Sequence, residues 1–318
     1  MEASGASKIL IVGGTGYIGR HVVRASINQG HPTFVYGRPI TPQTTPSKLL
    51  LHQEFLAKGV TFFQGELDEV AKLVEAVSRA DIVISTLAFP QILDQLKIIE
   101  AMKVAGNVKR FIPSEFGMEE GRLATHEPFH SYLERKISVR RATEASGIPY
   151  TFVAGNCFAR YFLHVLFHTY DNQADTIVYG TGETKAVMNL EEDIGMYAVK
   201  AADDPRTVNR IVIVRPPKNI TSQLELISLW ERLTGENLRK IYLSQQEMHK
   251  LIQSRPHPDN IRFAILNSVF IDGDTANYEL NGDDLEASKL YPDADYSSID
   301  KVVEEFLADP QPFEVAAF

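Results

Sequence analysis

The sequence has little cysteine and no feature of a secreted chain. Among its 318 residues, only Cys157 is a cysteine. A disulfide within the chain and a cysteine-based zinc or redox site are therefore excluded. A single thiol is usual in a reducing compartment, so we expect a cytoplasmic protein. Residues 1–8 contain neither a basic segment nor an apolar core, which is unlike a secretory signal.

Long apolar runs and an excess of positive charge are also absent. The most apolar stretch, 150–167, is interrupted by Asn156, Arg160 and His164, and is too polar to cross a membrane. The net charge of −9 at pH 7 argues against nucleic acid or an anionic membrane surface as the main partner. We therefore expect a small-molecule ligand and neither of those partners, and the sequence leaves a homo-oligomer open.

Metal-binding patterns are limited to one imperfect match. The segment from His126 to His130 has the letters H-E-x-x-H of a zinc site. Pro128 lies inside it and would break the continuous helix that must bring both imidazoles to one ion. We expect no metal.

Apolar runs rich in β-branched residues alternate with helical segments through the first half of the chain. Strands are expected at 8–13, 32–36, 60–64, 81–87, 108–113 and 150–154, with helices at 17–30, 48–58, 68–80, 91–105 and 129–146. Several strands are apolar almost throughout, which is typical of a parallel sheet covered on both faces. The pattern predicts an α/β fold whose doubly wound parallel sheet binds a dinucleotide, the Rossmann arrangement.

The second half of the chain is less regular. It offers strands at 176–179, 210–214 and 240–243 and helices at 193–202, 222–233 and 299–307. We predict an NADP-binding Rossmann domain over 1–157. A smaller α/β lobe over 158–318 would bind mainly the substrate, with some of its strands returning to the sheet.

A glycine-rich loop joins the first expected strand to the first expected helix. It reads Gly13, Gly14, Thr15, Gly16, Tyr17, Ile18 and Gly19, and contains G-x-G-x-x-G. In this strand–turn–helix context, glycines let the backbone approach a pyrophosphate, and the helix start presents free N–H groups to it. All seven residues are predicted to bind the cofactor.

The residue after the second strand indicates which dinucleotide binds. An NAD site usually carries an acidic residue there, but this chain has Arg38. A cation favours the 2′-phosphate of NADP(H). Lys48 is either a second cation for that phosphate or a solvated surface lysine.

Tyr132 and Lys136 lie four residues apart on an expected helix and share one face. In one interpretation they act with Ser114 as Y-x-x-x-K, and Tyr132 moves a proton to a carbonyl. In another, Lys136 alone is the acid–base group and Tyr132 lines the pocket. The pair could also be a solvated surface feature.

Longer motifs carry a resemblance over essentially the whole chain. They are GGTGYIG (13–19), HPTFVYGRP (31–39), DIVISTLAFPQILDQ (81–95), AGNVKRFIPSEFG (105–117), ERKISVRRA (134–142), GIPYTFVAGNCFA (147–159) and VYGTGETKAVMN (178–189). The sequence resembles the isoflavone reductase-like (NmrA-like) family of atypical short-chain reductases. Within that family it is most similar to the phenylpropene synthases, the eugenol and isoeugenol synthases.

The resemblance implies NADPH as hydride donor and Lys136 as the catalytic residue, with no tyrosine required. Tyr132 departs from the family pattern, so its role stays open. Carried over by position, the cofactor contacts would include Thr86, Ala88, Phe89, Gln91, Ser114, Glu115, Asn156, Cys157 and Phe158, with Arg140 helping to neutralise its charge. The substrate pocket would include Phe89, Ile92, Tyr132, Phe158, Tyr161 and Phe162. The run of Phe158, Tyr161 and Phe162 is alternatively part of the hydrophobic core.

The implied substrate is an esterified monolignol such as coniferyl acetate. Lys136, with a pKa lowered by burial or cationic neighbours, would take the phenol proton. The phenolate would expel acetate to give a quinone methide, which hydride reduces. Attack at the benzylic carbon gives eugenol, which Phe89 and Ile92 favour, and attack at the terminal carbon gives isoeugenol.

Two alternative functions stay open. One is that of a phenylcoumaran benzylic ether or pinoresinol–lariciresinol reductase, and the other is that of a non-catalytic NADP-sensing regulator.

Overall fold

A parallel five-stranded sheet forms the centre of the computed structural model, which describes residues 5–123, 127–167, 175–282 and 284–313. The strand order is β3-β2-β1-β4-β5, and all pairings are parallel. The strands are β1 (Ile9–Val12), β2 (Thr33–Gly37), β3 (Thr61–Gln64), β4 (Ile82–Ser85) and β5 (Arg110–Ile112). The order reverses between β1 and β4, so a ligand crevice is expected above their carboxyl ends. The predicted doubly wound sheet is confirmed.

Strands from the second half of the chain continue this sheet. β6 (Thr151–Ala154) pairs in parallel with β10 (Arg210–Ile213), which pairs in parallel with β13 (Leu285–Glu286). A single parallel bridge between Phe111 and Tyr150 links β5 to the start of β6. The sixth expected strand therefore belongs mainly to a second ladder. The predicted domain boundary at 157 stays a prediction.

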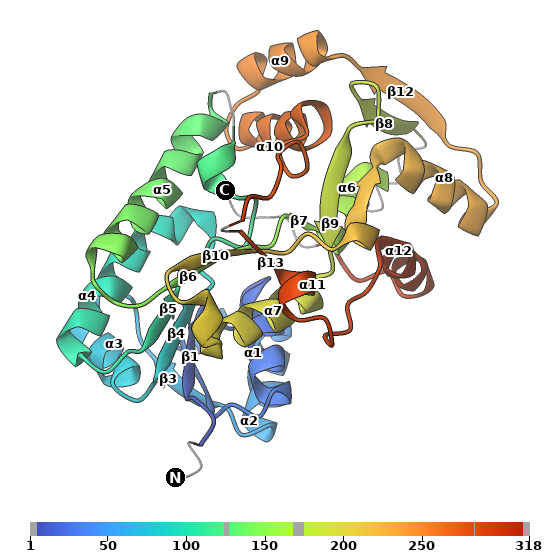
Figure 1. The fold of residues 1–318 in the computed structure, drawn as a ribbon. Helices are drawn as coiled ribbons and strands as arrows, with labels where there is room; N and C mark the ends of the chain where they lie inside the picture. The colour runs from blue at the N-terminus through green and yellow to red at the C-terminus, as the bar shows by residue number, and fades with distance from the viewer. Residues whose placement is uncertain (1–4, 124–126, 168–174, 283, 314–318) are drawn as a thin grey trace.

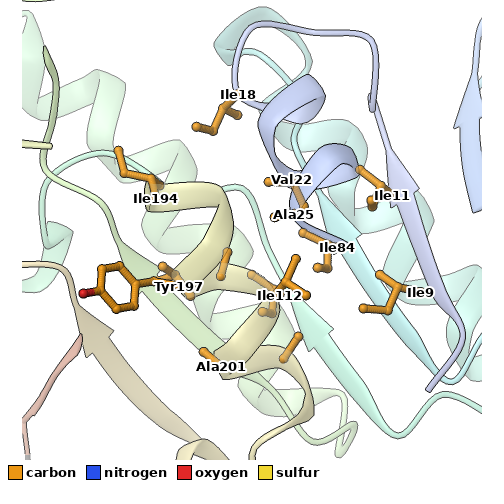
Figure 2. Packing of buried hydrophobic residues seen from close by; sticks show 14 of the residues in the cluster. Ile9, Ile11, Ile18, Val22, Ala25, Ile84, Ile112, Ile194, Tyr197 and Ala201 are labelled. Atoms are coloured by element: carbon orange, nitrogen blue, oxygen red, sulfur yellow. The ribbon is translucent and has the colours of Figure 1, made fainter. Parts of the chain in front are cut away.

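Helices cover both faces of the sheet, as its apolar strands require (Figure 1). Alternate strand residues such as Leu10, Val12 and Val83 pack toward α3 (Val70–Val77), α4 (Gln95–Ala105) and α5 (Phe129–Ala145). The intervening residues Ile9, Ile11 and Ile84 pack toward α1 (Gly19–Asn28), α2 (Pro46–Ala57) and α7 (Glu191–Asp203). Figure 2 shows Ile194 and Tyr197 of α7 facing Val22 and Ala25 of α1 across this core.

The α7 helix carries a buried carboxyl group that should make stability depend on pH. Asp193 accepts a hydrogen bond from the Ser297 N–H at 2.8 Å. Burial raises its pKa to about 7, assisted by the charges of Glu192 and Asp295 and opposed by that hydrogen bond. The folded state then holds a proton that the unfolded chain releases above about pH 4. Its contribution to stability is present below that pH and is lost as the pH rises toward 7.

We expect Asp193→Asn to remove this pH dependence. The amide oxygen can still accept the Ser297 N–H, but it has no charge to bury. At pH 8 the variant should exceed the wild type in unfolding free energy by about 2–4 kcal/mol, and at pH 4 the two should be similar. Urea denaturation at both pH values measures the difference. A variant that is less stable than the wild type at pH 8 would contradict the assignment.

The rest of the chain forms a lobe beside the sheet (Figure 1). Its strands are β7 (Cys157–Phe158), β8 (Asp175–Tyr179), β9 (Lys185–Asn189), β11 (Ile220–Ser222) and β12 (Arg239–Leu243). Its helices are α6 (Ala159–Phe167), α8 (Gln223–Thr234), α9 (Gln245–Ser254), α10 (Asp259–Asn267) and α12 (Ile299–Ala308). The short α11 (Ala287–Leu290) packs instead on the core between the sheet and α7. A second hydrophobic core around Phe162, Trp230 and Phe306 holds this lobe together. Within the described residues, no helix combines the length and apolar character needed to cross a membrane.

One expected helix is divided. The segment 91–105 was expected to be one helix, but a 3-10 helix (η1, Phe89–Asp94) precedes α4. Pro90, in the first turn of η1, has no N–H to donate. At the junction the buried Gln95 side chain donates to the Ile92 carbonyl at 3.2 Å and accepts the Ser114 N–H at 2.7 Å. Gln95 thus ties η1 to the loop after β5, and both segments border the candidate active site.

Candidate active site

The glycine loop has the shape that a dinucleotide requires. Gly13 has a φ of 86°, in the left-handed region, and its carbonyl accepts the Gly16 N–H at 2.9 Å. A Cβ on Gly19 would lie 2.7 Å from Thr86 Oγ1 and would overlap the Gly13 carbonyl oxygen. No side chain caps the start of α1, and no acidic residue lies in its first turn. The helix therefore presents N–H groups and positive dipole to an anion, which fits a pyrophosphate.

Two residues of the loop region also have structural contacts of their own. Ile18 is buried in the core between α1 and α7. The Tyr17 hydroxyl donates to Glu191 Oε1 at 2.6 Å, and its ring stacks on Phe158 at 5.8 Å between centroids. The buried Glu191 also accepts the Tyr161 N–H at 3.3 Å. The loop is thereby joined to α6.

Arg38 and Lys48 lie near the region expected for the adenosine end of the cofactor. Arg38 directly follows β2, and Lys48 lies in the first turn of α2. Both side chains are exposed, so either can reach a phosphate from solvent. The segment after β2, from Arg38 to Ser47, contains no acidic residue. This composition fits a 2′-phosphate and lacks the carboxylate that would bind a free ribose hydroxyl.

We expect Arg38→Ala to remove the preference for NADPH over NADH. A charge-assisted contact to the 2′-phosphate accounts for roughly 1.5–3 kcal/mol, so the Kd for NADPH should rise about 10- to 100-fold. The Kd for NADH should hardly change. Fluorescence titration with both nucleotides measures the ratio, and Lys48→Ala serves as the comparison for a nearby exposed cation. An unchanged ratio in Arg38→Ala would remove this assignment.

Lys136 lies in a buried ion pair. Its Nζ is 2.7 Å from Glu120 Oε1, and the exposed fractions of the two side chains are 15% and 1%. Glu120 begins a short 3-10 helix (η2, Glu120–Arg122) that follows the loop after β5 and packs on α5. One interpretation placed the Tyr132–Lys136 pair on a solvated surface, and for Lys136 that interpretation is wrong. Of the two alternatives expected for Lys136, burial or cationic neighbours, the structure shows burial, and the neighbour is a carboxylate.

Arg140, one turn further along α5, binds two more buried carboxylates. Its Nε and Nη2 donate to Glu115 Oε2 at 3.0 and 2.6 Å, and its Nη1 donates to Glu119 Oε1 at 2.7 Å. Burial and the Glu120 charge raise the pKa of Glu115 well above its usual range, and Arg140 opposes them. These contacts occupy donors that a cofactor phosphate would need, so the cofactor roles of Arg140 and Glu115 stay predictions.

Tyr132 is held as an aromatic wall. Its ring stacks on Phe89 of η1 with an interplanar angle of 13°. Burial raises its pKa, and the charges of Glu120 and Tyr161 act in the same direction. The phenol is therefore protonated at neutral pH and is a weak proton donor to a carbonyl. The Ser114 hydroxyl donates to the Leu87 carbonyl at 2.9 Å. Both observations favour the lysine interpretation over Y-x-x-x-K.

The remaining predicted residues lie around the same region or support it. Thr86 is buried and donates to the Val12 carbonyl at 2.9 Å, which holds β4 against β1. Asn156 has a φ of 60° and donates to the Val214 carbonyl at 2.9 Å. Burial raises the pKa of the Cys157 thiol, so it is not a ready nucleophile. Ala88 is exposed, Gln91 is half-buried and Ile92 is buried.

The predicted pocket aromatics form two groups. Phe89 and Tyr132 stack together, whereas Tyr17 contacts both Phe158 and Tyr161. Phe162 continues the second group, because its ring lies 5.6 Å from Tyr161 and 5.8 Å from Phe270 in the core of the lobe. Phe162 thus also has a core contact, and its pocket role stays a prediction.

The zinc-like letters do not describe a helix. His126 lies outside the described residues, and α5 begins at Phe129, with Pro128 at the position before it. Only His130 lies on the helix. No group of three or more His, Cys, Asp or Glu side chains able to hold a metal occurs in residues 5–123, 127–167, 175–282 and 284–313.

The sequence reasoning missed Gln95, Glu119, Glu120 and Glu191. Each is a polar side chain with an exposed fraction of at most 3%. A buried carboxylate needs a partner, but the partners lie 16 or more residues away along the chain, as for Glu120 and Lys136. The sequence signal for Glu119 and Glu120 was an acidic pair one residue beyond the PSEFG motif.

Comparison with known proteins identifies the family. The model of the NmrA-like family matches residues 5–307. The chain belongs to this family. Isoeugenol synthase 1 of Clarkia breweri is 51% identical over 96% of this chain and 97% of its own. Eugenol synthase 1 of Petunia hybrida is 46% identical, with 94% and 98% covered. The chain is an oxidoreductase of the isoflavone reductase-like group.

Solved structures agree with this family. Crystal structures of pinoresinol–lariciresinol and phenylcoumaran benzylic ether reductases include a chain with a TM-score of 0.90 and 41% identity, covering 95% of this chain and 99% of that one. The binary complex of leucoanthocyanidin reductase and NADPH from Vitis vinifera has a TM-score of 0.88 and 32% identity, with 95% and 100% covered.

Proposed function

We propose that this protein is an NADPH-dependent phenylpropene synthase that reduces an esterified monolignol, such as coniferyl acetate, to eugenol. The observation that carries the proposal is the half-buried Lys136 on α5, beside the stacked Phe89 and Tyr132 rings. A planar aromatic substrate and a phenol proton are what such a site can bind and move. Relatives at 46–51% identity are named eugenol and isoeugenol synthases.

The chain's own residues would bind and activate the substrate. The stacked Phe89–Tyr132 pair would form one aromatic wall beside the ring of the monolignol, and Lys136 would contact its para-hydroxyl. Removal of the phenol proton turns the ring into an electron donor that expels acetate and leaves a quinone methide. A buried, partly apolar site protects this electrophile from water.

NADPH, bound at the glycine loop with Arg38 at its 2′-phosphate, would supply the hydride that reduces the quinone methide. Overall, ester and hydride give phenylpropene and acetate, and the phenol proton is returned to the product. The solved complex of a relative with NADPH supports this choice of cofactor.

The position of hydride addition decides the product. Addition at the benzylic carbon gives eugenol. We expect Phe89, in the aromatic wall, and Ile92, next to that wall, to set the position of addition. Isoeugenol is the second candidate because two relatives at 51% and 49% identity are named isoeugenol synthases.

The test uses purified protein, NADPH and coniferyl acetate, with product identification by gas chromatography and mass spectrometry. We expect one equivalent each of acetate and eugenol per NADPH oxidised. Coniferyl alcohol, which lacks a good leaving group, and the 4-O-methyl ether of the ester, which lacks the phenol, should both be inert.

Other products would select among the alternatives. Mainly isoeugenol would overturn the benzylic preference and retain the reaction class. Turnover of dimeric benzylic ethers or lignans but not of monolignol esters would indicate a reductase of those substrates. NADPH binding without turnover of any of them would indicate a sensing role.

A further inference from the structure

Lys136 lies among more negative than positive charge. Three carboxylates, of Glu115, Glu119 and Glu120, and two cations, of Lys136 and Arg140, meet between the loop after β5, η2 and α5. The carboxylate side chains have exposed fractions of 1–2%. With every group ionised the cluster carries one excess negative charge, so it can take up one proton.

Glu120 differs from the other two carboxylates. Arg140 donates hydrogen bonds to Glu115 and Glu119. The oxygens of Glu120 are buried and accept no hydrogen bond from the residues the structure describes, although Oε1 lies 2.7 Å from Lys136 Nζ. Its charge acts on the groups that face it, which are Glu115 in the loop after β5 and Tyr132, Lys136 and Arg140 on α5.

An ion pair with Glu120 requires an ammonium group on Lys136. An ammonium has three donors and no lone pair, so it cannot accept a proton from a phenol. For Lys136 to receive that proton, it must first release one of its own. The nearest oxygen able to accept it is Glu120 Oε1.

We infer that Glu120 is the terminal acceptor of the substrate's phenol proton, which reaches it through Lys136. This inference rests on the proposed function. An N–H bond of Lys136 breaks as an O–H bond forms on Glu120, and the phenol O–H breaks as a new N–H forms on Lys136. The site passes from carboxylate, ammonium and phenol to carboxylic acid, ammonium and phenolate without a change in net charge. The reverse transfer returns the proton to the product phenolate. Glu120 is thus a positioning residue that acts through Lys136.

The pH profile separates this role from a structural one. If a carboxylate is the final acceptor, kcat/KM falls on the acid side only where that carboxylate becomes protonated. In Glu120→Gln the acceptor must be a free amine on Lys136. Reference ionisation lies near pH 4.3 for Glu and near 10.4 for Lys, so we expect the acid limb to move up by about two pH units or more. At pH 6 the variant should lose about 100-fold or more in kcat/KM, and near pH 9 it should recover most of it.

Two further variants make the test specific. Glu120→Asp keeps a carboxylate and should keep the acid limb near its wild-type position, even where the rate is lower. Glu119→Gln removes a neighbouring buried carboxylate that pairs with Arg140 and not with Lys136, and should leave the limb in place. If Lys136 acts alone as the base in the wild type, loss of the neighbouring carboxylate makes the amine a weaker base and moves the acid limb down. An acid limb that is unmoved or moves down in Glu120→Gln would therefore overturn the inference.

A second readout requires neither substrate nor NADPH. Trace labelling with acetic anhydride at pH 7, followed by peptide mass mapping, measures the free-amine fraction at Lys136. We expect labelling about tenfold faster in Glu120→Gln than in the wild type or in Glu119→Gln, and equal rates would overturn the pairing. The labelling rates can differ as expected between Glu120→Gln and the wild type while the wild type fails to turn over coniferyl acetate. That result would contradict the proposed function and leave the ion pair intact.

Discussion

Lys136→Met should reduce kcat on coniferyl acetate by about 10²- to 10⁴-fold and leave the Kd for NADPH within about threefold of the wild type. Methionine keeps most of the length and volume of the side chain but can neither donate nor accept the phenol proton, and proton transfer by a positioned group accounts for about 10²–10⁴ in rate. The glycine loop and Arg38 belong to other elements and are not changed. Stopped-flow turnover and nucleotide titration measure the two quantities.

Tyr132→Phe is the control for this experiment. It removes only the hydroxyl of a ring that stacks on Phe89, so turnover should stay within a few-fold of the wild type. An inactive Tyr132→Phe together with an active Lys136→Met would reverse the two roles and restore the Y-x-x-x-K interpretation. The burial that raises the pKa of Tyr132 argues against that outcome, because a phenol that is hard to ionise is a weak proton donor.

Lys136→Met also leaves the buried Glu120 carboxylate without a cation, so lower stability could obscure the kinetics. The double variant Lys136→Met with Glu120→Gln removes both charges, and we expect it to recover stability without activity. Recovery of activity in the double variant would show that Lys136 acts only through folding.

The strands of the sheet were predicted well from the sequence, because runs of apolar, β-branched residues determine strands locally. Strands β1, β3, β4, β5 and β6 lie within the ranges expected from apolar, β-branched runs, and β2 extends one residue beyond its range. The α5 helix spans Phe129–Ala145 against an expected 129–146. The division of 91–105 into η1 and α4 was not foreseen, because it depends on the Gln95 side chain bonding to Ser114 across the fold. The pairing of β6 with β10 likewise depends on contacts between residues about 60 positions apart.

The candidate site was predictable only in part for the same reason. The helical spacing of Tyr132 and Lys136 could be derived from the sequence, and so could the glycine loop. The charge of the neighbours could not be derived, since Glu115, Glu119 and Glu120 reach α5 only after the loop beyond β5 folds onto it. Burial or cationic neighbours were expected around Lys136. The structure shows burial, but the charged neighbour is the Glu120 carboxylate, and this changes which group can hold the proton.

Arg140→Met should lower the unfolding free energy by about 3–5 kcal/mol at pH 8. The Arg140 side chain is 13% exposed, and its two carboxylate partners, Glu115 and Glu119, are 2% and 1% exposed. Removing one partner of a buried ion pair leaves an uncompensated charge in a region of low dielectric constant. Arg140 also lies over the Phe152 ring at 4.6 Å, so part of the loss comes from that contact. Urea denaturation measures the change.

Arg141→Met is the matched control, because Arg141 is the next residue on α5 and is exposed. It removes the same charge and should change the unfolding free energy by no more than about 0.5 kcal/mol. Equal effects of the two substitutions would mean that net charge, and not the buried pairing, determines the loss.

The deficit of Arg140→Met should also depend on pH with a defined sign. In the wild type, burial and the Glu120 charge already raise the pKa of Glu115 to about 8, although Arg140 and Lys136 oppose them. Without the guanidinium the pKa of Glu115 rises further. Both folded proteins hold a proton that the unfolded chain releases above about pH 4.3, so they lose stability in parallel up to about pH 8. Above that pH only the variant still holds the proton and continues to lose stability, so its deficit should be larger at about pH 9.5 than at about pH 7. Adding Glu115→Gln should remove this extra loss, and a deficit that is the same at both pH values would contradict the assignment of Arg140 as the counter-ion of this cluster.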